Sequence, residues 1–291
     1  MSFYQGLIIL AVINVIAVIG TFLLTGMTGL LSFGQASFMA LGAYISGMLA
    51  VKFNIPFLLA ILMAIIASVF IGYIIAFPVV KLRRDYFALT TFAFGEFLKA
   101  VLNQSVAITG GATGLAGIPF KVNIWIVLIS LIIVILLVRN FRNSKFGKEC
   151  LAIRDDELAA RSCGIDSSRK KMTVFLFSVA VTSFAGCLYG FYTCYIDPSM
   201  FGWTKSSELV IMVFFGGLNS LTGVIIGTTF LTLSLEILRF TGAWRMFVYV
   251  LVMIILIDFR PQGVFGNWEL DGRTFEKFLH IPSSIIFKKE K

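Results

Sequence analysis

Charge is almost absent from the N-terminal part of this chain. No Asp, Glu, Lys or Arg occurs from Met1 to Val51, and only Lys52 interrupts the apolar sequence before Lys81. Charged residues make up 13% and hydrophobic residues 58% of the 291 residues, whereas soluble domains carry about a quarter charged residues. This scarcity excludes a soluble globular protein and predicts a polytopic helical membrane protein.

The residues that build metal centres and nucleotide sites are also scarce. The single histidine, His280, supports neither a metal cluster nor a proton relay, and the four cysteines lack metal-ligand spacing. No G-x-x-x-x-G-K-[ST] motif occurs, so nucleotide binding is not expected. No nucleophile–base constellation is present in the sequence either. We therefore expect no enzyme activity, catalytic residue, metal or cofactor in this chain.

The net charge of +9 has a membrane explanation. In a soluble chain it would suggest nucleic acid, but here the basic residues cluster at the ends of apolar stretches. There they set the topology and contact anionic membrane lipid. We therefore expect membrane lipid, and no nucleic acid, as a partner.

Apolar stretches long enough for membrane helices are frequent. A bilayer core of about 30 Å needs roughly 20 apolar residues, and the shortest stretches suggest broken or re-entrant helices that pack in protein or line a cavity. We predict an all-α transmembrane bundle of about eight or nine spans in one domain, 1–291. The first stretch lacks the features of a cleavable signal peptide, so we expect it to remain as a helix. The stretches are 3–24, 37–51, 56–77, 86–102, 122–138, 172–192, 206–215, 223–238 and 245–257.

Basic residues predict which loops face the cytoplasm. Residues 81–84 form one such loop, and the C-terminal tail, 259–291, is basic as well. Between them lie residues 139–171, here called the charged segment, with nine Lys/Arg and five Asp/Glu. These assignments agree if 86–102 and 122–138 form an out-and-back pair, with the N-terminus outside. We expect a multi-pass protein of a bacterial-type cell membrane.

The charged segment contains the signals of a short helix. Asp155 can cap helix amides, and Asp156 and Glu157 suit the positive end of the helix dipole. Gly164 can adopt the left-handed conformation that closes a helix. A helix of about eight residues is too short to be stable alone. We therefore expect it to pack on something.

This part of the sequence resembles a known family. The run from Gly147 to Lys171 is similar to the cytoplasmic loop of LivM-type permeases, subunits of ATP-binding-cassette importers for branched-chain amino acids. In that family the short helix is a coupling helix that docks in a groove of the ATPase subunit, and the local sequence corresponds to the "EAA…G" signature. The alternative is a solvated loop helix without a partner. The resemblance implies that the coupling residues are Asp156, Glu157, Ala159, Ala160 and Gly164.

Three further stretches resemble the same family, so the resemblance extends from about Gly26 to Gly266. They are 28–38, 84–96 with 109–115, and 216–223, and Ala112 stands where the family usually has proline. Glycines in broken membrane helices allow freed backbone groups to face a substrate route, or they simply permit tight packing, and both can hold. The first and last stretches also mirror one another, which hints at an internal repeat. The predicted pathway residues are Gly29, Ser32, Gly34, Gln35, Gly95, Glu96, Gly110, Gly111, Gly114, Gly216, Gly217, Ser220 and Gly223.

Glu96 and Lys99 are the chief charges within a predicted span. A charge at mid-membrane costs on the order of 3 kcal/mol. Their spacing allows an ion pair on one helix face. The alternative is that Glu96 borders the pathway.

The resemblance implies a transport function. The chain is expected to be a permease subunit that takes up branched-chain or related hydrophobic amino acids, with ATP bound on partner subunits. The implied partners are a paralogous permease, two ATPase subunits and an extracytoplasmic substrate-binding protein. One alternative is a permease for another small polar substrate, such as urea or amides. Another is a secondary transporter, which needs a buried titratable group and finds mainly Glu96.

Overall fold

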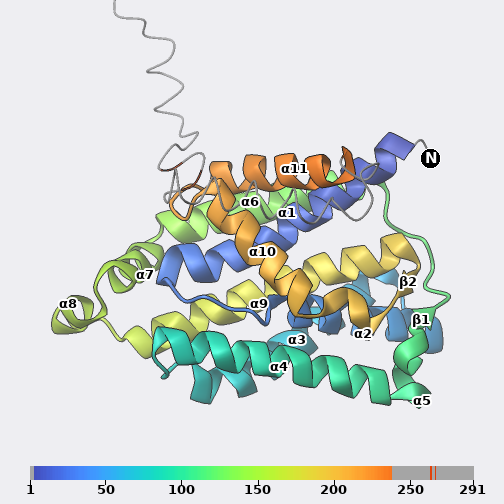
Figure 1. Cartoon of the computed structure of the whole chain (residues 1–291), viewed down its shortest axis with the longest axis horizontal. Coiled ribbons are helices and arrows are strands. Elements are labelled where there is room, and N and C mark those ends of the chain that lie inside the picture. The colour runs from blue at the N-terminus through green and yellow to red at the C-terminus, as the bar shows by residue number, and fades with distance from the viewer. Residues whose placement is uncertain (1–2, 238–262, 264–265, 267–291) are drawn as a thin grey trace, which may run out of the picture.

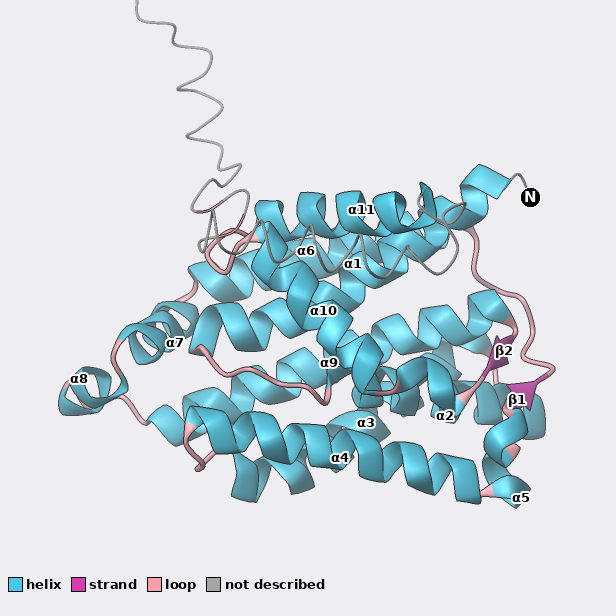
Figure 2. Ribbon diagram, in the orientation of Figure 1, coloured by secondary structure: helices cyan, strands magenta, loops and turns pink. Residues whose placement is uncertain are grey.

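In the computed structural model of the protein, residues 3–237 are described, together with Gly263 and Gly266. Helices dominate this part of the chain (Figures 1 and 2), which confirms a mostly helical fold. The predicted stretch 245–257 and most of the tail, 259–291, lie outside the described residues. The helices are α1 (Phe3–Thr28), α2 (Gln35–Lys52), α3 (Phe57–Val79), α4 (Arg84–Gln104), α5 (Val106–Thr109), α6 (Ile124–Asn143), α7 (Lys145–Asp155), α8 (Glu157–Ser162), α9 (Ser167–Thr193), α10 (Trp203–Gly216) and α11 (Leu221–Ile237), with 3-10 turns η1 (Gly111–Thr113) and η2 (Pro198–Phe201).

Four of the described helices, α1, α3, α6 and α9, are long and apolar enough to cross a membrane. The structure thus supports a multi-span protein, while the total of eight or nine spans stays a prediction. Helix α4 has 21 residues, but Arg84, Asp85, Glu96 and Lys99 make it more polar than these four. Helix α10, predicted as a piece of a broken helix, has only 14 residues.

Helix α9 lies at the centre of the bundle, where it packs against α1, α2 and α3. Small residues allow the close approach of α2 and α9. A Cβ added at Gly186 would overlap the Met39 carbonyl, and one added at Gly42 would overlap the Ser183 carbonyl. Ser183 also forms a hydrogen bond with Ser68 of α3 at 2.9 Å. Such packing by small and hydroxyl side chains is typical of helices that meet inside a membrane protein.

One pair of short strands departs from the predicted all-α fold. Strand β1 (Leu115–Ala116) pairs antiparallel with β2 (Tyr195–Ile196), and Leu115 lies opposite Ile196. Two-residue strands carry no periodic sequence pattern, so only the tertiary structure reveals them. The pair joins the loop after α5 to the end of α9, at the end of the bundle opposite α7 and α8 (Figure 1).

Two of the loops that were predicted to face the cytoplasm are neighbours in the structure, while the side of the membrane on which they lie stays a prediction. The Arg84 guanidinium donates a hydrogen bond to the Arg154 carbonyl at 2.7 Å, so the 81–84 loop lies beside the charged segment. The start of α1 lies at the opposite end of the bundle (Figure 1). This arrangement agrees with an outside N-terminus if the charged segment is cytoplasmic.

Candidate functional site

Helix α8 begins one residue later than the sequence predicted. Asp156 has an extended backbone, and its Oδ1 accepts hydrogen bonds from the N–H groups of Leu158 at 2.8 Å and Ala159 at 3.1 Å. Asp155, the predicted cap, is instead the last residue of α7. The helix has six residues rather than about eight. A side-chain cap of this kind stabilises a helix end by about 1 kcal/mol.

Helix α7 was not predicted from the sequence, although Ser144, a residue type that often caps helices, precedes it. The Ser144 hydroxyl accepts a hydrogen bond from the Gly147 N–H at 3.2 Å at the start of this helix. Cys150 and Ile153 are buried against the bundle, and burial raises the pKa of the Cys150 thiol to about 12. Lys170 and Glu149 form an ion pair that ties α7 to α9. Helix α7 is therefore built into the bundle.

Gly164 closes α8 in the predicted way. Its φ is +81°, a left-handed conformation that favours glycine. The Gly164 N–H donates to the Arg161 carbonyl at 2.9 Å, and the Ile165 N–H donates to the Ala160 carbonyl at 3.1 Å. These two bonds define a Schellman motif, which satisfies carbonyls that the helix end leaves unpaired.

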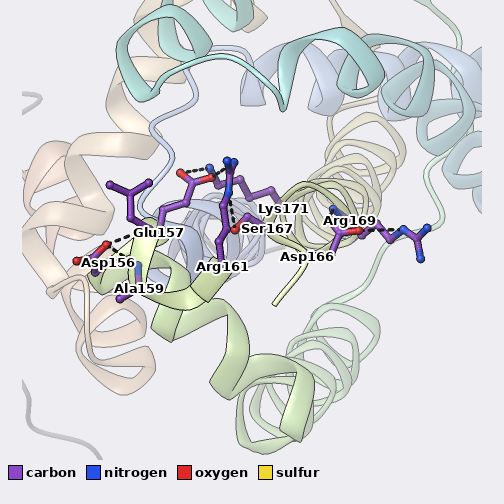
Figure 3. Close-up of polar contacts among 9 residues, drawn as sticks. Asp156, Glu157, Ala159, Arg161, Asp166, Ser167, Arg169 and Lys171 are labelled. Atoms are coloured by element: carbon purple, nitrogen blue, oxygen red, sulfur yellow. Dashed lines mark hydrogen bonds and ion pairs between the residues drawn. The ribbon is translucent and has the colours of Figure 1, made fainter. Parts of the chain in front are cut away.

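Glu157 holds α8 to the first turns of α9 (Figure 3). Its carboxylate contacts Arg161 and Lys171, each at 2.7 Å, and Arg161 also donates to the Ser167 hydroxyl at 3.3 Å. The Lys171 side chain is only 6% exposed. Burial alone would raise the pKa of the Glu157 carboxyl, but Lys171 and then Arg161 outweigh it and lower that pKa below its ordinary value. The carboxylate is thus the counter-ion of a buried lysine.

The side chains of α8 divide between an outer face and the interior. We define the outer face of α8 as Leu158, Ala159 and Ser162, all of which are exposed and lie one turn apart or adjacent. Leu158 is 76% exposed, whereas Ala160 is 4% exposed. Ala160 therefore packs α8 against the rest of the protein, while the apolar Leu158 side chain points away from it.

Three hydrogen bonds, here called the arginine links, join the charged-segment end of the bundle to the membrane helices. Arg154 of α7 donates to the Gly26 carbonyl near the end of α1 at 2.6 Å, and Arg84 donates to Arg154 as described above. Arg142, in the last turn of α6, donates to the Asn219 carbonyl between α10 and α11 at 2.6 Å. The last carbonyls of a helix lack intrahelical partners, so cations suit them. Arg84 was predicted only as a residue of the basic loop 81–84 and of the family-like stretch 84–96, and none of the three arginines was predicted to make these bonds.

The start of α2 brings several predicted pathway residues together. Gly34 packs against α4 so closely that a Cβ would lie 2.5 Å from the Thr91 carbonyl oxygen, and Gly95 of α4 lies beside Ser37. Buried Gln35 accepts a hydrogen bond from the Thr182 hydroxyl at 3.1 Å. Its Nε2 has no partner among the described residues. The start of α2 therefore offers one buried, unsatisfied donor.

The start of α10 lies at the same place. The Ala36 N–H of α2 donates to the Ser206 hydroxyl of α10 at 3.1 Å. Glu96 of α4 accepts a hydrogen bond from the Trp203 N–H at 3.2 Å and so occupies the positive end of the α10 dipole. Within residues 3–237 no Glu96–Lys99 ion pair forms. The predicted pairing is thus replaced by a helix cap.

The other predicted pathway residues lie elsewhere. Gly29, with φ of +67°, and buried Ser32 connect α1 to α2, next to the arginine links. The α10–α11 turn has similar features, because Gly217 also has a positive φ and Ser220 caps α11 by accepting from the Gly223 N–H at 2.9 Å. The structure therefore spreads the candidates over three levels of the bundle. Gly110, Gly111 and Gly114 lie between α5 and β1, at the end of the bundle opposite the α10–α11 turn (Figure 1). Gly216, Gly217, Ser220 and Gly223 lie in or next to that turn.

Comparison with known proteins confirms the resemblance to LivM-type permeases. A family model described as branched-chain amino acid transport system / permease component matches residues 3–257. The high-affinity branched-chain amino acid transport system permease protein LivM of Salmonella typhimurium is 29% identical over 289 residues, covering 88% of this chain and 68% of that protein.

More distant similarities extend to two other proteins. The permease protein LivH of the corresponding Escherichia coli system is 25% identical over 150 residues, which cover 51% of this chain and 48% of LivH. The structure of PsaBC from Streptococcus pneumoniae in complex with Fab gives a TM-score of 0.48 at 16% identity, covering 88% of this chain and 91% of that chain.

Proposed function

Because this chain belongs to the family of branched-chain amino acid transport system permease components, we propose that it is the membrane-spanning permease subunit of an ATP-driven importer. Its cargo is a branched-chain or related hydrophobic amino acid. ATP hydrolysis takes place on two separate ATPase subunits, so this chain performs no catalytic step. A paralogous permease and an extracytoplasmic substrate-binding protein complete the assembly in a bacterial-type cell membrane.

The outer face of α8 is the observation that carries this proposal. A six-residue helix is not stable alone, yet α8 is held by the Asp156 cap, the Gly164 closure and the Glu157 ion pairs. Its fixed geometry presents Leu158, 76% exposed, at one end of the bundle. A helix that is held in place and exposes an apolar side chain suits docking in a groove of a partner protein. We assign that groove to the ATPase subunit.

The contacts around α8 support a route by which its movement would reach the membrane helices. A displacement of α8 pulls on α9 through the Glu157–Lys171 ion pair. The adjoining α7 pulls on α1 through Arg154 and on α4 through Arg84. Because α9 packs on α1, α2 and α3, rigid-body movement of these helices alters the place where α2, α4 and α10 meet. We place the transport route there, beside Gly34, Gln35, Gly95 and Glu96.

Substitution on the outer face of α8 tests the coupling. Leu158→Glu puts a charge into the proposed groove, so ATPase subunits should dissociate, or ATP hydrolysis should continue without uptake. Ala152→Glu is the matched control, because Ala152 is exposed on the neighbouring α7. Co-purification of subunits and uptake in vesicles are the measurements. If the Leu158→Glu protein retains its ATPase subunits and transports normally, α8 is not the coupling helix.

Uptake assays test the cargo separately. A strain that lacks this gene should lose uptake of labelled leucine, isoleucine and valine, and the wild-type gene should restore it. Labelled urea and a short aliphatic amide serve as comparison substrates. Loss of urea or amide uptake with unchanged leucine uptake would reassign the cargo while leaving the coupling proposal intact.

A further inference from the structure

An open groove of about 530 Å³ lies between the end of α3 and the beginning of α9. The two helices run antiparallel, so the groove follows both of them from the charged-segment end toward the bundle interior. Its walls are apolar, and the residues on each helix recur at one-turn spacing on a single face. The walls are formed by Tyr73, Ala76, Phe77, Val80, Met172 and Leu176.

The rim of the groove is basic. Lys81 and Arg169 lie at its mouth with Ser168 and Thr173. The Lys81 ammonium lies 4.8 Å from the centre of the Phe77 ring, so its charge is held over the groove wall. The rim also includes the first turn of the 27-residue helix α9, whose dipole favours an anion.

Among the described residues, one carboxylate pairs with these cations. Asp166 contacts Arg169 at 3.1 Å, and the two side chains are 53% and 89% exposed. An exposed pair of this kind contributes little, and a guanidinium has five N–H donors, so Arg169 keeps donors for a second anion. Within the described lining, Lys81 and Arg169 therefore give the mouth a net positive charge.

A lipid with an anionic headgroup matches this combination. The mouth lies at the C-terminal end of α3, a helix that is long and apolar enough to cross the membrane. The end of a membrane helix lies at the level of the lipid phosphates. The apolar walls continue from Val80 to Tyr73, which is about 10 Å along the helix, toward the depth of acyl chains. Basic pockets between membrane helices on the cytoplasmic side bind acidic lipid headgroups. A neutral peptide would leave the basic rim without an anion.

We propose that this groove binds one anionic phospholipid, with its phosphodiester at Lys81 and Arg169 and an acyl chain along Phe77, Tyr73 and Leu176. The site is separate from the outer face of α8 and from the residues placed along the transport route. The proposal therefore stands independently of the identity of the cargo.

Native mass spectrometry of the full-length chain, purified with its associated subunits, tests the site. Phosphatidylglycerol and phosphatidylcholine with identical acyl chains are the two probes. Phosphatidylglycerol should bind more tightly, and Lys81→Gln with Arg169→Gln should weaken its binding about 30-fold, because each surface cation contributes about fivefold. The control, Lys145→Gln with Lys148→Gln, removes the same charge from exposed positions of α7 and should bind as the wild type does.

A second variant keeps the charges and fills the groove. Thr173 is exposed, so the fold should tolerate Thr173→Phe. The added ring should displace the acyl chain and reduce phosphatidylglycerol binding. The proposal is overturned if the charge variant binds phosphatidylglycerol like its control, or if both lipids bind equally. It is also overturned if Thr173→Phe releases a permease subunit from the complex, since a protein would then cover the groove.

Discussion

The two helices of the charged segment are held in opposite ways. Helix α7 buries Cys150 and Ile153 and binds α1 through Arg154. Helix α8 buries Ala160 and exposes Leu158, Ala159 and Ser162. Its position depends on polar contacts rather than on a core. The charged segment therefore consists of a helix anchored in the bundle, α7, here called the base, and an exposed helix held by polar contacts, α8, here called the tip.

Removing the ion pairs of the tip should have the largest effect. Glu157→Gln leaves the buried Lys171 ammonium without its carboxylate, which should destabilise the α8–α9 junction by about 3 kcal/mol. Hydrogen exchange at the α8 amides should become faster while α7 remains protected. The control is Asp155→Asn, because the Asp155 side chain is 73% exposed and its contact with Arg154 is long, at 3.4 Å. Equal protection of α8 in Glu157→Gln and the control would contradict the role of this pair.

Removing the hydrogen bond between the base and α1 should have the next largest effect. Arg154→Ala removes a charge-assisted hydrogen bond of 2.6 Å to the Gly26 carbonyl, a contact of about 2 kcal/mol. Uptake per ATP hydrolysed should fall about tenfold or more, while the subunits still assemble through α8. Lys148→Ala, an exposed residue of the same helix, is the control. An unchanged coupling ratio in Arg154→Ala would show that movement reaches the bundle by another route.

Straining the end of the tip should have a smaller effect. Gly164→Val forces a β-branched residue into φ of +81°, which costs about 1 kcal/mol or more. No neighbouring atom lies within 4 Å of a Cβ there, so strain rather than collision is the cause. Thermal unfolding should show the decrease, and Ser162→Val, at a helical position, should show less. A Gly164→Val protein as stable as Ser162→Val would remove the conformational argument.

Acidity should affect the tip only well below neutral pH. The folded-state pKa of Glu157 is lower than its ordinary value of 4.5, so the stabilisation from its ion pairs is fully present above pH 4.5 and is lost as pH falls through the lowered pKa. Coupling should therefore not change between about pH 6 and pH 8 through this group. If α8 protection declines within that range in the wild type but not in Glu157→Gln, the direction of the pKa shift is wrong.

Cysteine labelling should distinguish the solvent exposure of the base from that of the tip without any substitution. Cys163 is exposed at the end of α8, whereas Cys150 is buried in α7 and its thiol, with a pKa of about 12, is protonated at neutral pH. A maleimide should label Cys163 quickly and Cys150 only after unfolding. Bound ATPase subunit should slow Cys163 labelling. Equal labelling with and without that subunit would place the docking surface elsewhere.

Local sequence signals predicted the tip better than the base. Gly164, the acidic first turn and the small residues identified a short helix, because capping and closure depend on neighbouring residues. The cap was misplaced from Asp156 to Asp155, since either carboxylate can serve and only the backbone conformation chooses. The arginine links join residues such as Arg154 and Gly26, 128 positions apart, which no local pattern can predict. The same holds for Glu96, which caps α10 and does not pair with its neighbour Lys99.

The amino-acid sequence alone determined that this protein is a bundle of membrane helices with one charged segment, because apolar length and basic flanks act locally. It did not determine which helices form the core. Helices α1, α3 and α6 are similarly apolar, yet α1 is 72% buried over its most apolar window, against 28% for α3 and 22% for α6. Lipid and protein interior are equally apolar, so hydrophobicity cannot distinguish them. Only the tertiary structure made that choice, through close contacts such as Gly186 with Met39 and the ion pair that holds α8 to α9.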